Sequence, residues 1–480
     1  MSLSGLGRPR AARAAALFCA AALLAASCGS DDDEGAPGAA EATTTAPAPA
    51  AKDEAFGRQG DVVTGRGGLR IDLKKCASGW SDTAGITDKE IRLGQSYPMS
   101  GSLASTAPLA LGVRYYYEHI NRTEGGVGGK TLSLATKDDG YEAARTTSNV
   151  TEFLETGNVF AMTSIGGTPP NLAVRDVLNE RCVPQLMPSS GHHAFGDPEN
   201  YPWTTSGILD YRSEPKIWSR YITEAVGKGA SIAALVLNND FGKGLSSSFT
   251  QYGKEEGLNL TKVVTHEANA PTLTNEITTL TSSGADVALI ITTGNYCTQA
   301  LQGVANSVWK PKLKLMFSGC ALTSLMKPVG AGADGWVSFA YNKDLSDKAL
   351  ANDPGVVAAR KVITDGGANP DDNSYYGLGV FFAVPTVEMF KRAAKRPGGL
   401  TRSNVAIEAW GLKFNHPLLF EGVAFEANGL QDPYYVQGGQ PLKYTIQPGQ
   451  DVGVFAPFGK AVDVNGSIGP CKWDGRECAA

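Results

Sequence analysis

The sequence predicts an α/β protein made of two doubly wound lobes, each built on a parallel sheet. Three observations support this: strand-like and helix-like stretches alternate along the chain, the alternation is interrupted once and restarts, and the strand at 287–292 is apolar without alternation. Continuous apolar strands are typical of parallel sheets covered by helices on both faces. With 480 residues, 42% of them hydrophobic, the chain is long enough for two packed lobes.

The individual elements follow from the hydrophobic period of each stretch. In the first run we expect strands at 90–101, 131–139, 159–167 and 182–190, and helices at 109–122, 143–157 and 171–181. A turn-rich segment, 196–215, interrupts the pattern. In the second run we expect strands with their following loops at 232–244, 260–268, 286–297, 312–321 and 335–344, and helices at 245–257, 273–284 and 298–308.

The N-terminus has the features of an export signal. Arg8, Arg10 and Arg13 precede an apolar run at 14–27, which is too short for a bilayer span. The sequence LLAASC resembles the lipobox of bacterial lipoproteins, although Ala25 stands where Leu is usual. We expect residues 1–27 to be a lipoprotein signal peptide and Cys28 to be acylated; the alternative is simple cleavage that leaves a free Cys28 thiol.

The composition after the signal predicts a tether and excludes some partners. Residues 28–75 are expected to be a disordered tether, because the part that follows Cys28 is rich in Ala, Pro, Thr and acids. The net charge of the whole chain is −5, and the signal holds three of its cations and no acid. This balance argues against a nucleic-acid partner and against a polybasic membrane patch.

Six cysteines remain outside the signal and the anchor, an even number in an oxidising compartment, which predicts three disulfides. Cys297 and Cys320 follow successive strands of one sheet and are within reach of each other if those strands are neighbours. Cys471 and Cys478 would close a short loop. Cys76 and Cys182 are paired only by elimination.

Several motifs that carry chemistry elsewhere lack their structural context here. GGVGGKT, at 125–131, ends like a phosphate-binding loop, but Glu124 stands where the first Gly is needed, and the order is helix, turn, strand. GAGADG, at 330–335, leads into a strand. His192 and His193 have no H-E-x-x-H motif, and no G-x-S-x-G occurs. We therefore expect no nucleotide, no other cofactor, no metal and no catalytic nucleophile.

The segments that follow the predicted strands are dense in Gly, Ser, Thr, Asn and aromatic residues. These loops lie at the carboxyl ends of the strands, where helix N-termini gather and ligands bind in such sheets. Together with their order, the segments ITDKEIRLGQSYPMSGSLA, GGVGGKTLSLATKDDGYEAARTTSNVTEFLE, NVFAMTSIGGTPPNLA, VPQLMPSSG, NDFGKGL and GADVALIITTGNY resemble the leucine/isoleucine/valine-binding type of ABC-transporter substrate-binding protein, with the periplasmic binding protein type I fold. The resemblance covers 86–444.

The resemblance implies two lobes joined by a three-strand hinge, with the ligand clamped between them. It places the crossovers near 203–208, 339–342 and 428–437. Lobe 1 is then expected at 86–206 and 342–428, lobe 2 at 207–341 and 429–460, and a C-terminal tail with a local disulfide at 461–480.

The resemblance also implies the ligand-binding residues. Hydroxyls and backbone N–H groups of lobe 1 are expected to bind a ligand carboxylate, and the positions that match are Gly167, Thr168, Ser189, Ser190 and Gly191. The matching aromatic residues are Tyr97, Phe241, Tyr296 and Tyr375. Core packing is the alternative for each aromatic residue.

One position departs from the family. Members that bind amino acids carry an acid in a lobe-2 loop to pair with the α-ammonium group, and Cys320 occupies that place here, with Asp240 as the nearest substitute. A buried ammonium without a carboxylate partner is costly, so a small carboxylate, an amide or an aromatic acid is favoured over a zwitterionic branched-chain amino acid.

These expectations combine into one functional hypothesis. The chain is expected to be a monomeric, non-enzymatic solute-binding protein, exported and held by lipid at the outer face of the cell membrane, that delivers an amino-acid-like molecule, an amide or a small carboxylate to the permease of an ABC importer. A ligand-sensing module of the same fold is the first alternative, and an exported hydrolase is the second.

Overall fold

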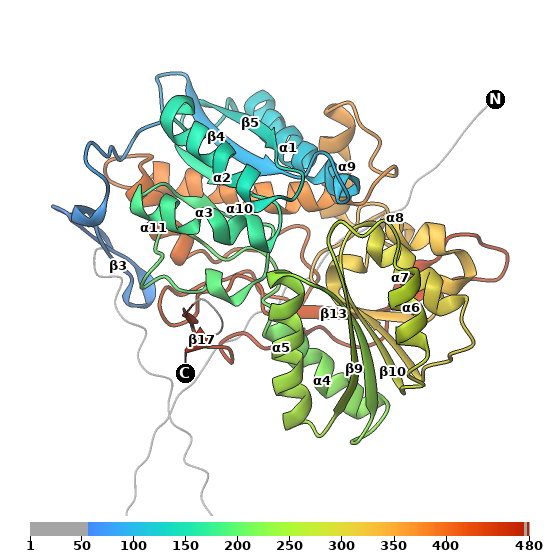
Figure 1. Cartoon of the computed structure of the whole chain (residues 1–480). Helices are drawn as coiled ribbons and strands as arrows, with labels where there is room; N and C mark the ends of the chain where they lie inside the picture. Colours follow the sequence, from blue (N-terminus) through green and yellow to red (C-terminus); the bar gives the residue numbers. More distant parts are fainter. Residues whose placement is uncertain (1–55, 475–477, 480) are drawn as a thin grey trace, which may run out of the picture. The chain divides into compact units, whose positions relative to one another are not determined.

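The computed structural model describes residues 56–474 and 478–479. The predicted signal peptide, Cys28 and the first part of the predicted tether lie outside these residues. Two sheets organise the described chain, and each has helices packed against it (Figure 1). We call the part built on the first sheet lobe 1 and the part built on the second sheet lobe 2. The predicted α/β architecture with parallel sheets is confirmed.

Lobe 1 contains a four-stranded parallel sheet in the order β5-β4-β6-β7. Its strands are β4 (Glu90–Tyr97), β5 (Thr131–Asp138), β6 (Ala161–Thr163) and β7 (Gln185–Leu186). Its helices are α1 (Pro108–Glu124), α2 (Ala143–Glu152) and α3 (Thr168–Glu180), joined later in the chain by α9 (Pro354–Asp365), α10 (Tyr375–Ala394) and α11 (Arg402–Trp410). The glycine-rich segment after α1 is the turn into β5, because Gly125 ends the helix in the left-handed region.

Two glycines allow α1 and α10 to pack closely in lobe 1. A Cβ on Gly112 would lie 2.2 Å from the backbone oxygen of Tyr376, and one on Gly379 would lie 2.2 Å from that of Leu109. Helix α10 is buried along most of its length, as expected for a helix that is apolar on all sides. It therefore has a fixed position, which matters because its first residues reach the cavity described below.

Lobe 2 contains a sheet in which strands β8 to β12 are parallel to one another and the last strands pair antiparallel. The strand order is β14-β13-β12-β11-β10-β8-β9, with β15 paired to β13. The strands are β8 (Ser231–Leu237), β9 (Asn259–His266), β10 (Val287–Ile291), β11 (Leu313–Met316), β12 (Trp336–Ala340), β13 (Gly438–Thr445), β14 (Val454–Pro457) and β15 (Val462–Asp463). Helices α4 (Ser213–Ala225) and α5 (Asp240–Glu255) lie on one side of β9 and β10 in Figure 1, and α6 (Thr274–Thr281), α7 (Asn295–Ala305) and the short α8 (Thr323–Met326) lie on the other.

The chain passes between the two lobes three times. It leaves β7 for α4, leaves β12 for α9, and returns before β13. The first and third passages pair through a parallel bridge between Leu209 and Val436, and the second pairs with the segment before the third through Asn342 and Leu419. The residues expected for the crossovers, near 203–208, 339–342 and 428–437, lie within or next to these passages.

The predicted tether is wrong for its last twenty residues. Residues 57–72 form a small antiparallel sheet of β1 (Gly57–Gln59), β2 (Val62–Thr64) and β3 (Arg70–Asp72). Val63 and Ile71 are buried in a separate core with Trp203 and Trp410. The strands are only three residues long, so their alternation was too brief to be read as a strand signal.

Three disulfides are present among the described residues, and they are the three pairs expected from the sequence. They join Cys76 to Cys182, Cys297 to Cys320, and Cys471 to Cys478. Strands β10 and β11 are neighbours in the sheet, so the condition placed on Cys297 and Cys320 is met. The first disulfide fastens the small N-terminal sheet to lobe 1.

The C-terminal tail packs on the folded body through residues of both lobes. It includes the short strands β16 (Lys472–Trp473) and β17 (Cys478–Ala479). The N–H of Cys471 donates to the oxygen of Gly196, 3.0 Å away, and Lys216 on α4 donates to the hydroxyl of Ser467 at 3.1 Å. The tail is therefore part of the body.

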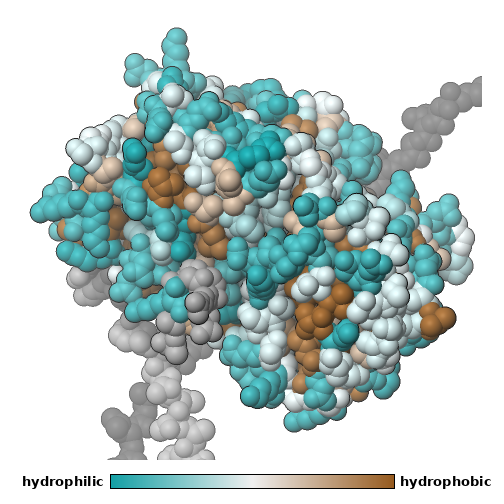
Figure 2. All heavy atoms as spheres, in the orientation of Figure 1, coloured by the Kyte–Doolittle hydropathy of each residue, from teal (hydrophilic) through white to brown (hydrophobic). Residues whose placement is uncertain are grey.

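The surface shown in Figure 2 is mostly hydrophilic, with small separate apolar areas. The described part of the chain exposes the large hydrophobic side chains Val263 on β9 and Val357 on α9, and Val308 and Phe458 in two separate loops. Within the described residues, no helix combines the length and the apolar character that a membrane span requires.

Replacing Gly112 by Ala tests the close contact of α1 and α10. Alanine favours helix formation, but the added methyl group would meet the backbone oxygen of Tyr376, and a backbone atom cannot move aside cheaply. We expect the overpacking to prevail and to lower the free energy of unfolding by about 1–3 kcal/mol, measured by urea denaturation. Gly57→Ala is the control, because no atom lies within 4 Å of its Cβ position. Equal stability of both variants would contradict the prediction.

Candidate ligand-binding site

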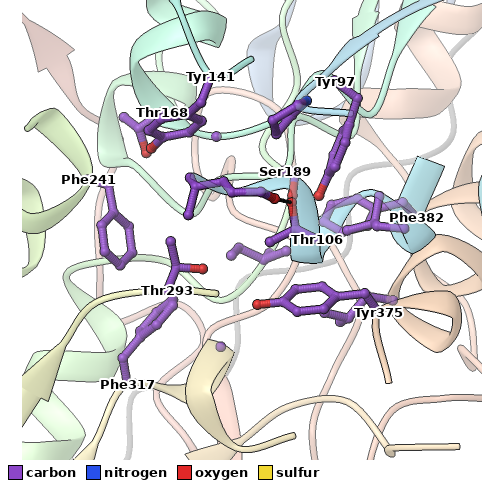
Figure 3. A pocket seen from close by; sticks show the side chains of 18 of the residues that line it. Tyr97, Thr106, Tyr141, Thr168, Ser189, Phe241, Thr293, Phe317, Tyr375 and Phe382 are labelled. Carbon is purple, nitrogen blue, oxygen red and sulfur yellow. Dashed lines mark hydrogen bonds between the residues drawn. The ribbon is translucent and has the colours of Figure 1, made fainter. Parts of the chain in front are cut away.

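A cavity of about 80 Å³ is lined by residues of both lobes at the carboxyl ends of their strands. Rings and hydroxyl groups surround it on several sides (Figure 3). Its lining consists of Tyr97, Pro98, Leu103, Thr106, Leu109, Tyr141, Gly166, Gly167, Thr168, Ser189, Ile208, Tyr211, Phe241, Thr293, Phe317, Gly319, Tyr341, Tyr375, Leu378 and Phe382. Helices α3, α5 and α10 all begin at the cavity, so each contributes residues of its first turn.

Six of the ten residues predicted to bind ligand line this cavity. They are Tyr97, Gly167, Thr168, Ser189, Phe241 and Tyr375. Tyr97 ends β4, Gly167 and Thr168 begin α3, Phe241 lies in the first turn of α5, and Tyr375 begins α10. These six residues therefore lie together at strand ends and helix starts, and their role in ligand binding stays a prediction.

The structure places Ser190 and Gly191 behind the lining. The hydroxyl of Ser190 is buried and lies 2.7 Å from that of Thr168, and it also accepts the N–H of His192 at 3.1 Å. Gly191 packs against the backbone oxygen of Leu209, where a Cβ would lie at 1.9 Å. Both residues support the wall, and Ser189 is the residue of this loop that lines the cavity.

Tyr296 and Cys320 also lie outside the lining. The hydroxyl of Tyr296 donates to the backbone oxygens of Ala268 and Ala270, at 2.8 and 2.9 Å. Cys320 is buried in its disulfide, and its neighbour Gly319 lines the cavity instead. Asp240, considered as a substitute acid, is exposed and does not line the cavity.

Sequence reasoning missed more lining residues than it found. Tyr141, Thr293 and Phe317 lie in loops whose composition had marked them as a group. Leu378 and Phe382 follow Tyr375 on α10 by three and seven residues, a helical spacing that could have identified them. Tyr211 and Tyr341 lie in or next to the crossovers, where no periodic pattern marked them.

None of the lining residues carries a formal charge. The polar side chains among them are hydroxyl groups of Ser, Thr and Tyr. Burial raises the pKa of the Tyr97, Tyr141, Tyr211, Tyr341 and Tyr375 hydroxyls above the ordinary value, so they remain protonated at neutral pH. The wall can therefore donate and accept hydrogen bonds without presenting an ion.

A family model for periplasmic binding proteins matches residues 90–438 of this chain. The chain belongs to the periplasmic binding protein family. No curated protein matches it. The match spans both lobes and all three crossovers, so the resemblance inferred from the sequence is confirmed.

Solved structures with the same fold include proteins described with different ligands. A branched-chain amino acid ABC transporter protein from Thermus thermophilus with bound valine is 19% identical, with a TM-score of 0.69, over 79% of this chain and 97% of that one. A fatty acid ABC transporter substrate-binding protein from Thermomonospora curvata is 17% identical, with a TM-score of 0.67, over 81% and 96%. An ABC transporter solute-binding protein from Rhodopseudomonas palustris HaA2 in complex with p-hydroxybenzoic acid is 15% identical, with a TM-score of 0.66, over 78% and 98%.

Two buried carboxyl groups of this periplasmic binding protein lie directly behind its cavity wall. Glu214, on α4, accepts the N–H and the hydroxyl of Ser318 at 2.7 and 3.1 Å, beside the lining residues Phe317 and Gly319. Burial raises the pKa of Glu214 well above its ordinary value. Burial also raises the pKa of Asp139, whose carboxylate binds the hydroxyl of Ser96. Each oxygen of Glu214 thus accepts a hydrogen bond from Ser318, which lies between two lining residues.

His192 and His193 form a buried stacked pair with ring centroids 4.2 Å apart. Desolvation lowers the pKa of both, that of His193 to about 3. In the described part of the chain, no three side chains of His, Cys, Asp or Glu cluster in a way that could hold a metal. At neutral pH both rings are therefore uncharged, and Nδ1 of His192 accepts the N–H of Ala194 at 3.2 Å.

The neutral state of His193 predicts a loss of stability in acid. An unfolded histidine has a pKa near 6.5, whereas the folded one stays neutral down to about pH 3. Below pH 6.5 the unfolded chain therefore binds a proton at this residue, whereas the folded chain does not. His193 thereby lowers the free energy of unfolding by up to about 1.4 kcal/mol per pH unit of acidification. The stability advantage of the wild type over His193→Gln, measured by urea unfolding, should shrink between pH 7 and pH 4.5. A constant difference would contradict this.

Proposed function

We propose that this chain is a lipid-anchored, extracytoplasmic solute-binding protein that captures a small polar organic ligand between its two lobes and delivers it to the permease of an ABC importer. The observation that carries the proposal is the uncharged, hydroxyl-rich and aromatic cavity at the carboxyl ends of both sheets. Similar folds whose descriptions name ABC transporters support it.

The chemistry of the lining favours binding over catalysis. Ser189, Thr168 and Thr293 could serve as nucleophiles only beside a general base, and no His, Lys, Asp or Glu stands among the lining residues. A hydroxyl without such a base remains a hydrogen-bonding group. This favours capture over the exported hydrolase considered from the sequence.

The ligand class follows from which charged groups of a ligand the cavity wall can pair with. A zwitterionic amino acid would bring an ammonium group to a wall without an acid, and such a group is costly to bury unpaired. Glu214 lies close, but it does not line the cavity, and each of its oxygens already accepts a hydrogen bond from Ser318. A small carboxylate, an amide or an aromatic acid fits better, because hydroxyls and the starts of α3 and α5 favour acceptors and anions. An amino-acid-like ligand remains the broad class.

A ligand-sensing module of the same fold is the second candidate function, since its cavity would be identical. The two functions differ in the partner that recognises the closed lobes. Neighbouring genes for permeases and ATPases favour transport, and a neighbouring receptor gene favours sensing.

A thermal-shift screen of leucine, isoleucine, valine, urea, acetamide, benzoate and 4-hydroxybenzoate tests the ligand class. We expect a benzoate-type acid or an amide to raise the melting temperature more than any of the three amino acids. Thr168→Val should weaken binding of the best compound about tenfold, because it removes one lining hydroxyl. Thr147→Val is the matched control, since Thr147 is exposed on α2, away from the cavity, and its hydroxyl donates to the Ala143 oxygen. Strongest stabilisation by leucine or valine would contradict the argument from charge.

Cys28→Ala tests the lipid anchor. Wild-type protein expressed in a bacterial host should incorporate radiolabelled palmitate and sediment with membranes, and the variant should do neither, because the sulfur that accepts the acyl chain is gone. Cys19→Ala is the control, since Cys19 lies inside the predicted signal. Equal incorporation by wild type and Cys28→Ala would exclude acylation at this position.

A further inference from the structure

Tyr141 belongs to lobe 1 but bonds to lobe 2. It lies in the loop between β5 and α2 and lines the cavity. Its hydroxyl accepts a hydrogen bond from Nδ2 of Asn239 at 3.3 Å. Asn239 is the N-cap of α5, and its Oδ1 accepts the N–H of Gly242 at 3.3 Å. One phenol therefore contacts the ligand cavity and the opposite lobe.

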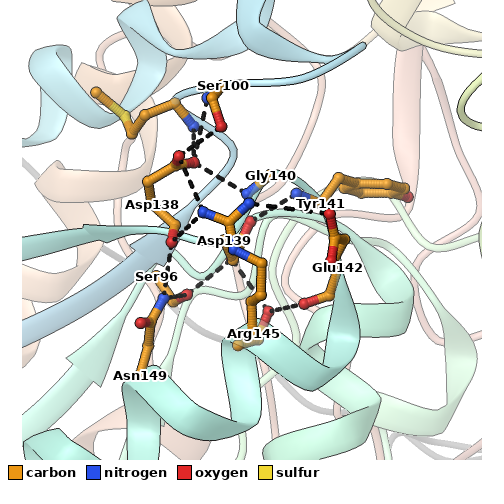
Figure 4. A network of polar contacts seen from close by, with 11 residues as sticks. Ser96, Ser100, Asp138, Asp139, Gly140, Tyr141, Glu142, Arg145 and Asn149 are labelled. Atoms are coloured by element: carbon orange, nitrogen blue, oxygen red, sulfur yellow. Dashed lines mark hydrogen bonds and ion pairs between the residues drawn. The ribbon is translucent and has the colours of Figure 1, made fainter.

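The backbone of Tyr141 is held in a conformation that a tyrosine rarely adopts. Its φ is +67°, in the left-handed region, which is unfavourable for a bulky residue. The carboxylate of Asp139 accepts the N–H of Tyr141 at 2.9 Å. The same buried carboxylate accepts the hydroxyls of Ser96 and Thr146 at 2.7 and 3.1 Å (Figure 4). This network offsets the backbone strain.

A second carboxylate stiffens the same loop. Asp138 accepts the N–H groups of Met99, Ser100 and Gly140 at 2.9, 3.1 and 2.9 Å, and it pairs with Arg145 at 3.1 Å (Figure 4). Desolvation opposes ionisation, but the hydroxyl of Ser100 and the N–H groups of Gly140, Met99 and Ser100 lower the pKa of Asp138 to about 2. The base of the Tyr141 loop is thereby fixed to the loop after β4.

The ring of Tyr141 rests on a position where only glycine leaves room. A Cβ on Gly167 would lie 2.2 Å from Cε2 of Tyr141, and Gly167 has a φ of +78°. Gly167 directly precedes α3. The phenol is therefore held between the first turn of α3 in lobe 1 and the first turn of α5 in lobe 2.

We propose that Tyr141 and Asn239 form a latch that stabilises the closed arrangement of the two lobes. The strained, doubly anchored loop places the hydroxyl of Tyr141 where it can bond Asn239 only while the lobes are together. The latch would lengthen the time that a bound ligand stays in the cavity, and this purpose rests on the proposed capture function. In this proposal Tyr141 holds the two lobes in the closed arrangement.

The test measures the distance between the lobes in the full-length protein. Nitroxide labels are attached to p-acetylphenylalanine at positions 308 and 357, which leaves every cysteine untouched. Val308 of lobe 2 is 98% exposed, and Val357 of lobe 1 is 51% exposed. Double electron–electron resonance then reports the ratio of open to closed molecules in wild type, Tyr141→Phe, Asn239→Ser and the double variant. Serine at position 239 retains a capping oxygen for α5 but is too short to reach Tyr141.

Each single variant should raise the ratio of open to closed molecules by on the order of threefold to tenfold, the effect of one net hydrogen bond. The double variant should raise it no further than either single variant, because both remove the same bond. Tyr444→Phe is the matched control, since its hydroxyl bonds the N–H of Gly453 inside lobe 2. Its distance distribution should equal that of the wild type.

An unchanged distribution in Asn239→Ser overturns the latch, as does a double variant whose effect is the product of the two single effects. Asn239→Ser gives an independent reading if Tyr141→Phe does not fold. No ligand enters the measurement. Failure to find a ligand would therefore count against the proposed function, whereas an unchanged distance distribution would count against the latch alone.

Discussion

The carboxylate of Asp344 joins the parts of the chain on which the cavity depends. It is only 5% exposed, and its oxygens accept the N–H of Thr323 at 2.6 Å, the hydroxyl of Ser374 at 3.0 Å and the N–H of Ser346 at 2.9 Å. Thr323 belongs to α8 of lobe 2, and Ser374 directly precedes α10 of lobe 1. A buried carboxylate needs such donors to offset its desolvation. Because Tyr375 follows Ser374, this one group sets where α10 meets lobe 2.

The cavity that results is lined mainly by hydroxyl groups and aromatic rings. Tyr211, Phe241 and Phe317 contact one another at centroid distances of 5.0 to 5.9 Å, in edge-on arrangements, and form a rigid apolar corner. The buried hydroxyls elsewhere in the wall need partners. If the cavity captures a ligand as proposed, a ligand that pairs with these hydroxyls would be favoured over analogues that leave them unpaired, without any charged side chain.

The fold was predictable from the sequence because the hydrophobic residues of both lobes repeat with the periods of strands and helices. The lining of the cavity was predictable only in part. Tyr97 and Thr168 lie where strands end and helices begin, and these positions can be read from the hydrophobic pattern. Ser189 and Ser190 cannot be distinguished in this way, because one turns to the cavity and the other to Thr168. Tyr341 lines the cavity because of the direction that the chain takes as it leaves β12 for lobe 1. That direction depends on contacts between residues far apart in the sequence. The small N-terminal sheet was missed because its stability comes from Trp203 and Trp410 and not from its own short strands.

The attachment of that N-terminal sheet has a mechanical consequence. The Cys76–Cys182 disulfide joins the sheet to the end of α3, and Arg58 pairs with Asp82 at 2.9 Å. The N–H of Leu430, at the third crossover, donates to the oxygen of Gly67 at 3.2 Å. A pull on the chain before Phe56 is therefore carried into lobe 1 through a covalent bond. Lobe 2 receives that force through the crossovers and through the contacts between the lobes, among them the bond from Asn239 to Tyr141, so the force reaches it indirectly.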